Sequence, residues 1–125
     1  MKTLSLALVL FFSALSLSTT TLASHASSKE FNPACHQQPN LVGGWTKTSP
    51  SQQVTESLMQ IMAEMNLPAG LKKVTDVRSQ VVNGTNYAVE FELENGQVWH
   101  VTFYRSLREK TTVTEPAHRG FLCNQ

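Results

Sequence analysis

Two Asn-Gly dipeptides, at 83–84 and 95–96, divide a long alternating segment that begins at Leu71. Asn and Gly tolerate the positive φ angles that two-residue hairpin turns require, so each dipeptide predicts a tight turn. Between them, residues 85–94 alternate apolar and polar side chains, which is the period of a half-buried strand. Because each turn reverses the chain, the strands on its two sides must pair antiparallel, and a meander is expected at the centre of the fold.

The same period extends on both sides of the two turns. We predict strands over 71–82, 85–94 and 98–106, and a last strand that starts near Thr111. Pro116 interrupts the last strand and places it at a sheet edge, since proline cannot donate to a strand ladder. The alternation gives the sheet one apolar face and one solvated face that is rich in glutamate.

The segment that starts at Ser49 predicts the helix of the domain. Ser49 is the expected N-cap, Pro50 takes the first helical position and Gln52 completes a capping box. A partner groove is the alternative role for its methionines, but the apolar residues share one helical face that suits the sheet. With a short strand over 45–47, the expected fold is α+β, with one helix across a four- to five-stranded antiparallel sheet. The apolar helical positions are Val54, Leu58, Ile61, Met62 and Met65.

The first 26 residues predict an export signal. Lys2 gives a positive start, residues 4–17 are apolar but too few to span a bilayer comfortably, and Ala23 or Ala26 offers the cleavage site. A membrane anchor is the alternative. Cleavage leaves about 100 residues, the size of one small domain.

We divide the exported chain into an extended N-terminal trunk over 27–40 and a domain over 41–125. The net charge is +1 and no basic cluster is longer than 71–73, so a nucleic-acid partner is not expected. Two cysteines, Cys35 and Cys123, predict a disulfide in an exported protein. It would close a loop of about 90 residues and add roughly 4 kcal/mol of stability in the chain-entropy model. A catalytic thiol is the alternative.

Strand order brings three irregular segments to one end of the sheet. Alternate turns of a meander lie at the same end, so the turns at 83–84 and 107–110 are neighbours. A first strand antiparallel to the second brings residues 43–44 to that end as well. Val81 and Val82 are consecutive, so one of them must point away from the core and leave an exposed apolar side chain. Exposed apolar patches usually meet a partner.

Motifs at this end resemble those of the cystatins, inhibitors of papain-like cysteine proteases. Leu-Val-Gly-Gly at 41–44 is similar to the family's trunk around its glycine, and residues 58–66 resemble the end of its helix. Residues 80–84 fit its Gln-x-Val-x-Gly loop, and His100 with Ser106-Leu107 is similar to the strand before its second loop. The order and spacing of these motifs resemble a divergent, single-domain member.

The resemblance implies reversible, tight-binding inhibition without enzyme activity, cofactor or metal. The apolar turn would occlude the catalytic Cys-His pair of a protease, while Leu41 and Val42 would fill substrate pockets and Gly43 would let the trunk bend away. The residues that the resemblance assigns to protease binding are Leu41, Val42, Gly43, Gln80, Val81, Val82, Asn83, Gly84, Leu107 and Arg108.

Two features depart from the family pattern. The second loop, 107–110, is charged and lacks the family's proline and tryptophan. Secreted animal cystatins also carry two disulfides, whereas this chain has cysteines for one. The alternative function is a non-inhibitory binding module with the same fold.

Asn83-Gly84-Thr85 is an acceptor sequence for N-glycosylation. A glycan at this turn would prevent entry into a cleft, which favours a compartment without that modification, such as a bacterial periplasm, or a different function. We expect a secreted or periplasmic protein that does not associate with a membrane after the signal is removed. It is expected to be monomeric, with a domain-swapped dimer as the alternative. Enzyme motifs such as Gly-x-Ser-x-Gly are missing, and the histidines lack metal-ligand spacing.

Overall fold

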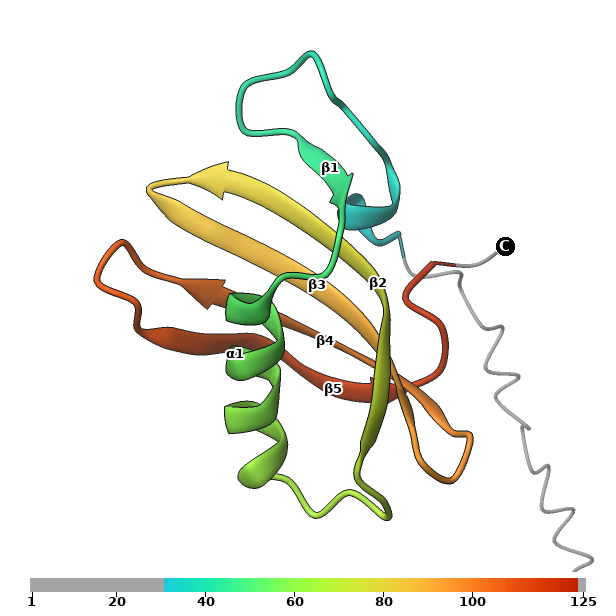
Figure 1. Cartoon of the computed structure of the whole chain (residues 1–125). Coiled ribbons are helices and arrows are strands. Elements are labelled where there is room, and N and C mark those ends of the chain that lie inside the picture. The colour runs from blue at the N-terminus through green and yellow to red at the C-terminus, as the bar shows by residue number, and fades with distance from the viewer. Residues whose placement is uncertain (1–30, 124–125) are drawn as a thin grey trace, which may run out of the picture. The chain divides into compact units, whose positions relative to one another are not determined.

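The computed structural model describes residues 31–123, which form one helix and a five-stranded antiparallel sheet (Figure 1). The strands lie side by side in chain order, and this confirms the α+β meander predicted from the sequence. The elements in chain order are the 3-10 helix η1 (Pro33–Cys35), β1 (Trp45–Thr48), α1 (Gln52–Ala63), β2 (Leu71–Val82), β3 (Gly84–Leu93), β4 (Val98–Arg105) and β5 (Thr111–Arg119).

The predicted export signal over 1–26 and the first residues of the trunk lie outside the described residues. Within residues 31–123, no helix is long and apolar enough to cross a membrane.

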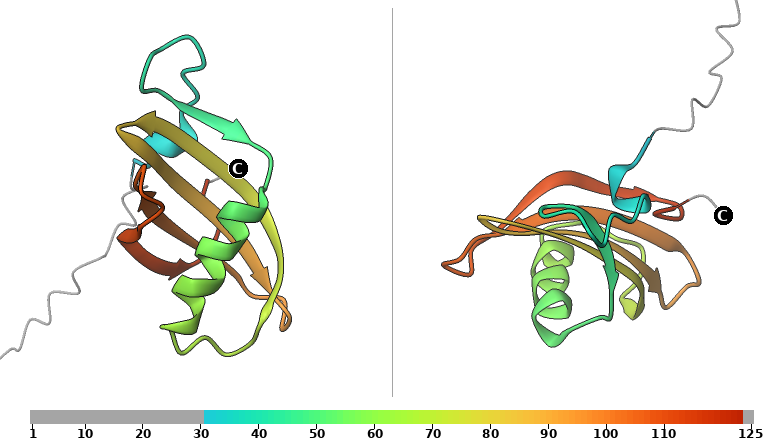
Figure 2. Two further views of the ribbon diagram at one scale, coloured as in Figure 1. Left: turned by 60° about the vertical axis from the view of Figure 1, so that its left-hand side comes forward. Right: turned by 90° about the horizontal axis from the view of Figure 1, so that it is seen from above.

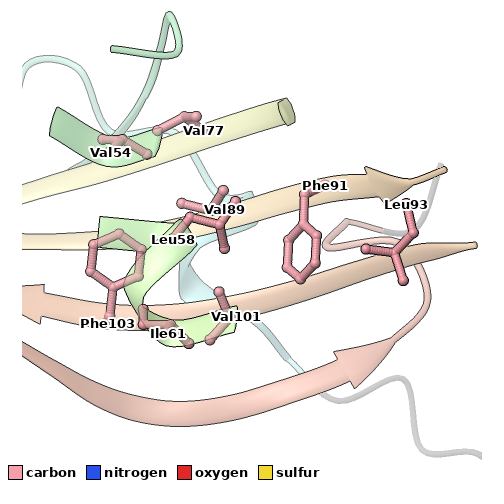
Figure 3. Close-up of a cluster of buried hydrophobic side chains, with 9 residues drawn as sticks. All are labelled: Val54, Leu58, Ile61, Val77, Val89, Phe91, Leu93, Val101 and Phe103. Carbon is pink, nitrogen blue, oxygen red and sulfur yellow. The ribbon is translucent and has the colours of Figure 1, made fainter. Parts of the chain in front are cut away.

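The main core lies between α1 and one face of the sheet, as the two periodicities predict. Helical residues at spacings of three and four meet alternate residues of β3 and β4, and all of them are buried (Figure 3). Their side chains leave water together, which supplies most of the driving force for folding. The nine core residues are Val54, Leu58, Ile61, Val77, Val89, Phe91, Leu93, Val101 and Phe103.

The helix begins two residues later than the capping pattern predicts. Ser51 is the N-cap, and its hydroxyl oxygen accepts a hydrogen bond from the backbone N–H of Val54 at 3.2 Å. The predicted cap at Ser49 and the capping box are wrong, because Ser51 is an equally good N-cap and the local pattern does not decide between the two serines. Gln52 instead donates from its side-chain amide to the carboxylate of Glu56 at 2.8 Å.

Neither Asn-Gly turn is the two-residue turn that the sequence predicts. Their glycines have positive φ, but both asparagines lack it. In the β3–β4 turn, Gly96 donates its backbone N–H to Leu93 (2.9 Å), and Leu93 donates to Gln97 (2.8 Å). A three-residue loop that ends in a left-handed glycine explains this pattern. In the β2–β3 turn, Val82 pairs with Gly84, and Asn83 is the single residue between them.

The sheet face opposite α1 is partly covered, not fully solvated as predicted. Ala34 of η1 and Leu122 pack on Ala88 of β3, and all three side chains are buried. Figure 2 shows η1 and the C-terminal segment on the other side of the sheet from α1. Glu90, on the same face, accepts a hydrogen bond from the backbone N–H of Leu122 at 2.8 Å. This second, smaller core holds the two ends of the domain.

The predicted disulfide between Cys35 and Cys123 is present, with a Cα–Cα distance of 5.6 Å. Both cysteines of the chain are therefore bonded, which excludes the catalytic-thiol alternative. The segment before β1 is not the extended trunk that the sequence predicts. It contains η1 and then folds back, because Gln38 donates its backbone N–H to the carbonyl of Trp45 at 2.9 Å.

Candidate functional site

Three connecting segments meet at one end of the sheet, as the strand order predicts. Trp45 pairs with Gln80, and Arg105 pairs with Thr85 on one side and Thr111 on the other. The segments joined to these residues therefore end together, whereas the β3–β4 turn lies at the far end (Figure 1). We call this end of the sheet the loop edge. It consists of the N-terminal loop (38–44), the first turn (81–85) and the second turn (106–110).

The loop edge exposes apolar side chains from all three segments. Among residues 31–123, five of the nine exposed large apolar residues lie in these three segments. Because exposed apolar clusters are uncommon on monomeric proteins, the loop edge is the candidate contact surface. The exposed fractions are 59% for Leu41, 101% for Val42, 67% for Val81, 47% for Val82 and 78% for Leu107.

The two valines of the first turn lie on opposite faces of the hairpin. Successive residues of a strand alternate, so Val81 shares the helix face with the buried Val77 and Val82 lies on the other face. Both are exposed because β2 and β3 extend beyond the elements that cover the sheet. The turn therefore presents apolar surface on both sides of a thin hairpin.

Leu41 and Val42 lie in a loop that backbone hydrogen bonds close on itself. Leu41 donates its backbone N–H to the carbonyl of Gln38 (3.1 Å), and Gly44 donates to the carbonyl of Leu41 (2.9 Å). A Cβ on Gly44 would lie 2.5 Å from the Gln38 carbonyl oxygen, so the loop is too tight for a larger residue there. Gly43, with φ +76°, leads the chain into β1.

Gln80 joins the N-terminal loop to the hairpin. Its side-chain amide donates to the carbonyl oxygen of Gly43 at 2.9 Å, and its amide oxygen accepts from the Asn86 side chain at 2.9 Å. Gln80 and Asn86 are half-buried. The sequence did not single out Asn86, although strand register places it directly across from Gln80. Cross-strand partners of motif residues are the signal that could have found it.

The first turn is packed against Tyr104 of β4. The Tyr104 hydroxyl donates to the carbonyl of Asn83. Gly84 has φ +102°, and a Cβ there would lie 2.5 Å from the Tyr104 hydroxyl and 2.7 Å from the carbonyl oxygen of Arg105. Glycine is therefore required twice, by its backbone angle and by this close approach. Tyr104, like Asn86, contacts the loop edge from a strand and was not singled out by the sequence.

The second turn presents mixed chemistry. Leu107 and Arg108 are exposed, and Glu109 is the only residue other than glycine with positive φ among those described. Ser106 donates its backbone N–H to the Lys110 carbonyl at 2.9 Å and closes the turn. A cavity of about 210 Å³ separates this turn from the first turn on the helix side. It is lined by Gln53, Gly84, Thr85, Tyr87, Arg105, Ser106, Leu107 and Glu109.

Comparison with known families agrees with this architecture. A family model described as the cystatin domain matches residues 43–118, from the end of the N-terminal loop through most of β5. The chain has no match among curated proteins. Cystatins generally inhibit cysteine proteases and are typically not enzymes. Because the match covers more than half of the 125 residues, the chain belongs to the cystatin family.

Proposed function

We propose that this protein is a reversible, tight-binding inhibitor of papain-like cysteine proteases, and that its loop edge occludes the active-site cleft. The observation that carries the proposal is the first turn, which holds Val81 and Val82 exposed on the two faces of a thin hairpin. A narrow ridge with apolar sides suits a cleft with two walls. Family membership supplies the class of target.

The geometry supports inhibition by occlusion, without a chemical step. The first turn is closed by strand pairing and the second turn by backbone hydrogen bonds, so both would lose little conformational freedom on binding. A few buried apolar anchors can supply most of the affinity of an interface of about 800 Å² per partner. We assign that role to Val81 and Val82, with Asn83 and Gly84 forming the turn between the two strands.

The N-terminal loop is the second contact of the proposed inhibitor. Leu41 and Val42 would enter apolar substrate pockets beside the catalytic cysteine, and Gly43 would turn the chain away from it. Their exposure and their position next to the first turn support this assignment. Leu107 adds apolar area, whereas Arg108 lies at a solvated rim where charged contacts contribute little.

We also propose that the protein is exported and acts in a secreted or periplasmic compartment. The disulfide supports this, because such bonds persist mainly in oxidising compartments. The working division is a signal over 1–26, a trunk over 27–40, of which η1 packs against the sheet, and a monomeric domain over 41–125. Asn83 is exposed in an acceptor sequence for N-glycosylation, so the active form would carry no glycan there.

Titration of papain with the oxidised protein tests the proposal. We expect reversible inhibition that Val82→Asp weakens at least about 100-fold, because a carboxylate would have to leave water in an apolar cleft. Val113→Asp is the matched control, since Val113 is exposed to a similar extent, 42% against 47%, but lies on β5 outside the loop edge. Equal losses in the two variants would contradict the proposal.

A non-inhibitory binding module is the second candidate. The charged second turn and the acceptor sequence at Asn83 favour it, because both reduce the fit to an apolar cleft. The two candidates separate in one measurement. A folded, oxidised sample that leaves papain fully active at tens of micromolar would support the module and exclude the inhibitor.

A further inference from the structure

We propose that Gln80 and Asn86 are positioning residues, which hold the N-terminal loop against the first turn and do not themselves touch the target. This inference rests on the proposed inhibitory function. It revises the role that the family resemblance gives to Gln80, and it adds Asn86 to the residues on which inhibition depends.

Two hydrogen bonds in series carry the inference. Asn86 donates from Nδ2 to Oε1 of Gln80, and Gln80 donates from Nε2 to the carbonyl oxygen of Gly43, both at 2.9 Å. The Gln80 amide is therefore held at both ends, which fixes its orientation. Register places Trp45, Gln80 and Asn86 directly across from one another on three adjacent strands, so their side chains share the sheet face opposite α1.

The hydrogen bond from Gln80 is the side-chain contact that ties the N-terminal loop to β2. Leu41 and Val42 are exposed, so neither anchors the loop by burial. The backbone hydrogen bonds of the loop close it on itself and on Trp45, whereas the bond from Gln80 reaches it from β2. A Cβ on Gly43 would lie 4.0 Å from the Val81 carbonyl oxygen, so loop and turn are adjacent there.

Both ends of the Gln80 amide are held within the protein, and we therefore assign the side chain an indirect effect on inhibition. Nε2 points to Gly43 and Oε1 to Asn86, and the side chain is half-buried between them. Losing either bond would loosen the hold on the Gly43 carbonyl and with it the placement of Leu41 and Val42 relative to the turn. The first turn would be unaffected, because Val81 still pairs with Thr85 and Val82 with Gly84.

Isosteric variants separate positioning from contact. Gln80→Glu replaces the Nε2 donor with an oxygen that faces the Gly43 carbonyl, and Asn86→Asp removes the donor to Gln80 without changing shape. Gln60→Glu is the matched control, because it makes the same change at an exposed position of α1. Each variant is made in the native chain and in a chain with Leu41→Ala and Val42→Ala.

We expect Gln80→Glu and Asn86→Asp to weaken papain inhibition about five- to tenfold in the native chain, the usual effect of one lost hydrogen bond. In the chain whose loop carries two alanines, the same substitutions should change inhibition less than about twofold, since the loop has no anchors left to position. Equal losses in the two backgrounds would show that Gln80 contacts the target and would overturn the inference.

Hydrogen exchange gives a readout that needs no protease. The backbone N–H groups of Leu41 and Gly44 are donors within the loop, and we expect them to exchange at least about fivefold faster in Gln80→Glu. They should be unchanged in Gln60→Glu, and the amide of Val101 in the core should be unchanged in both. Unaltered loop exchange in Gln80→Glu overturns the inference. If exchange responds but the native chain leaves papain active, the positioning role stands and the inhibitory function fails.

Discussion

Replacing Gly84 with alanine tests the close approach of the first turn to β4 in the candidate site. The first turn places Gly84 at φ +102°, against Tyr104 and the backbone of β4. Gly96, in the β3–β4 turn, has a similar φ of +84°, but a Cβ there would meet no atom within 4 Å. The two glycines thus share a backbone requirement and differ in their surroundings, so Gly96→Ala is a matched control.

The expected magnitudes follow from these distances. Positive φ costs an L-residue about 1–2 kcal/mol, and this applies to both variants. At Gly84 the new methyl group would also lie 2.7 Å from the Arg105 carbonyl oxygen, a backbone atom that cannot rotate away. Overpacking of this kind costs about 1–3 kcal/mol more. We expect Gly84→Ala to lower the free energy of unfolding by about 3 kcal/mol and Gly96→Ala by about 1 kcal/mol.

Urea unfolding followed by circular dichroism measures both losses in the oxidised protein. For a domain of this size, each 1 kcal/mol also lowers the melting temperature by about 4–8 °C. Equal losses in Gly84→Ala and Gly96→Ala would refute the reasoning, because the contact with β4 would then contribute nothing beyond backbone strain.

Three further predictions concern stability. Replacing Cys35 and Cys123 with serine should lower the free energy of unfolding by roughly 4 kcal/mol, since the bridge spans 88 residues, and equal urea midpoints would contradict this. Glu109→Gly should raise it by up to about 1 kcal/mol, because glycine accepts the φ of +65° that strains glutamate, and a lower midpoint would argue against strain. Leu58→Ala should lower it by about 3 kcal/mol through a cavity in the core, measurable in the same assay.

The sheet could be predicted from the sequence because its information is local and repeated. Alternation over 85–94 specifies which residues of β3 face α1, and a slip of one residue would expose every one of them. In β2, two register shifts, between Leu71 and Lys73 and between Val74 and Asp76, interrupt the alternation. The observed β2 has the predicted limits, and β3 differs from its predicted limits by one residue at each end. The convergence of three segments followed from strand order alone.

Details that depend on tertiary contacts could not be predicted in this way. Ala88 lies on the polar face of β3 by alternation, but η1 and the C-terminal segment bury it. The disulfide and the hydrogen bond from Leu122 to Glu90, both formed between distant residues, help to hold them there. The N-cap moved from Ser49 to Ser51 because two adequate caps flank Pro50, and local pattern does not choose between them. The hydrogen bond from Gln80 to Gly43 joins residues far apart in the chain, so no local pattern encodes it.

The closed N-terminal loop changes where binding energy can come from. In an extended trunk, each residue that becomes ordered on binding costs about 1–2 kcal/mol of backbone entropy. Here the loop is ordered during folding by three contacts. These are the disulfide, the hydrogen bond from Gln38 to Trp45 and the hydrogen bond from the Gln80 side chain to Gly43. More of the apolar contact made by Leu41 and Val42 would then remain as affinity. A preordered loop can thus compensate for a charged second turn, and the proposed inhibitor would depend chiefly on two contacts instead of three.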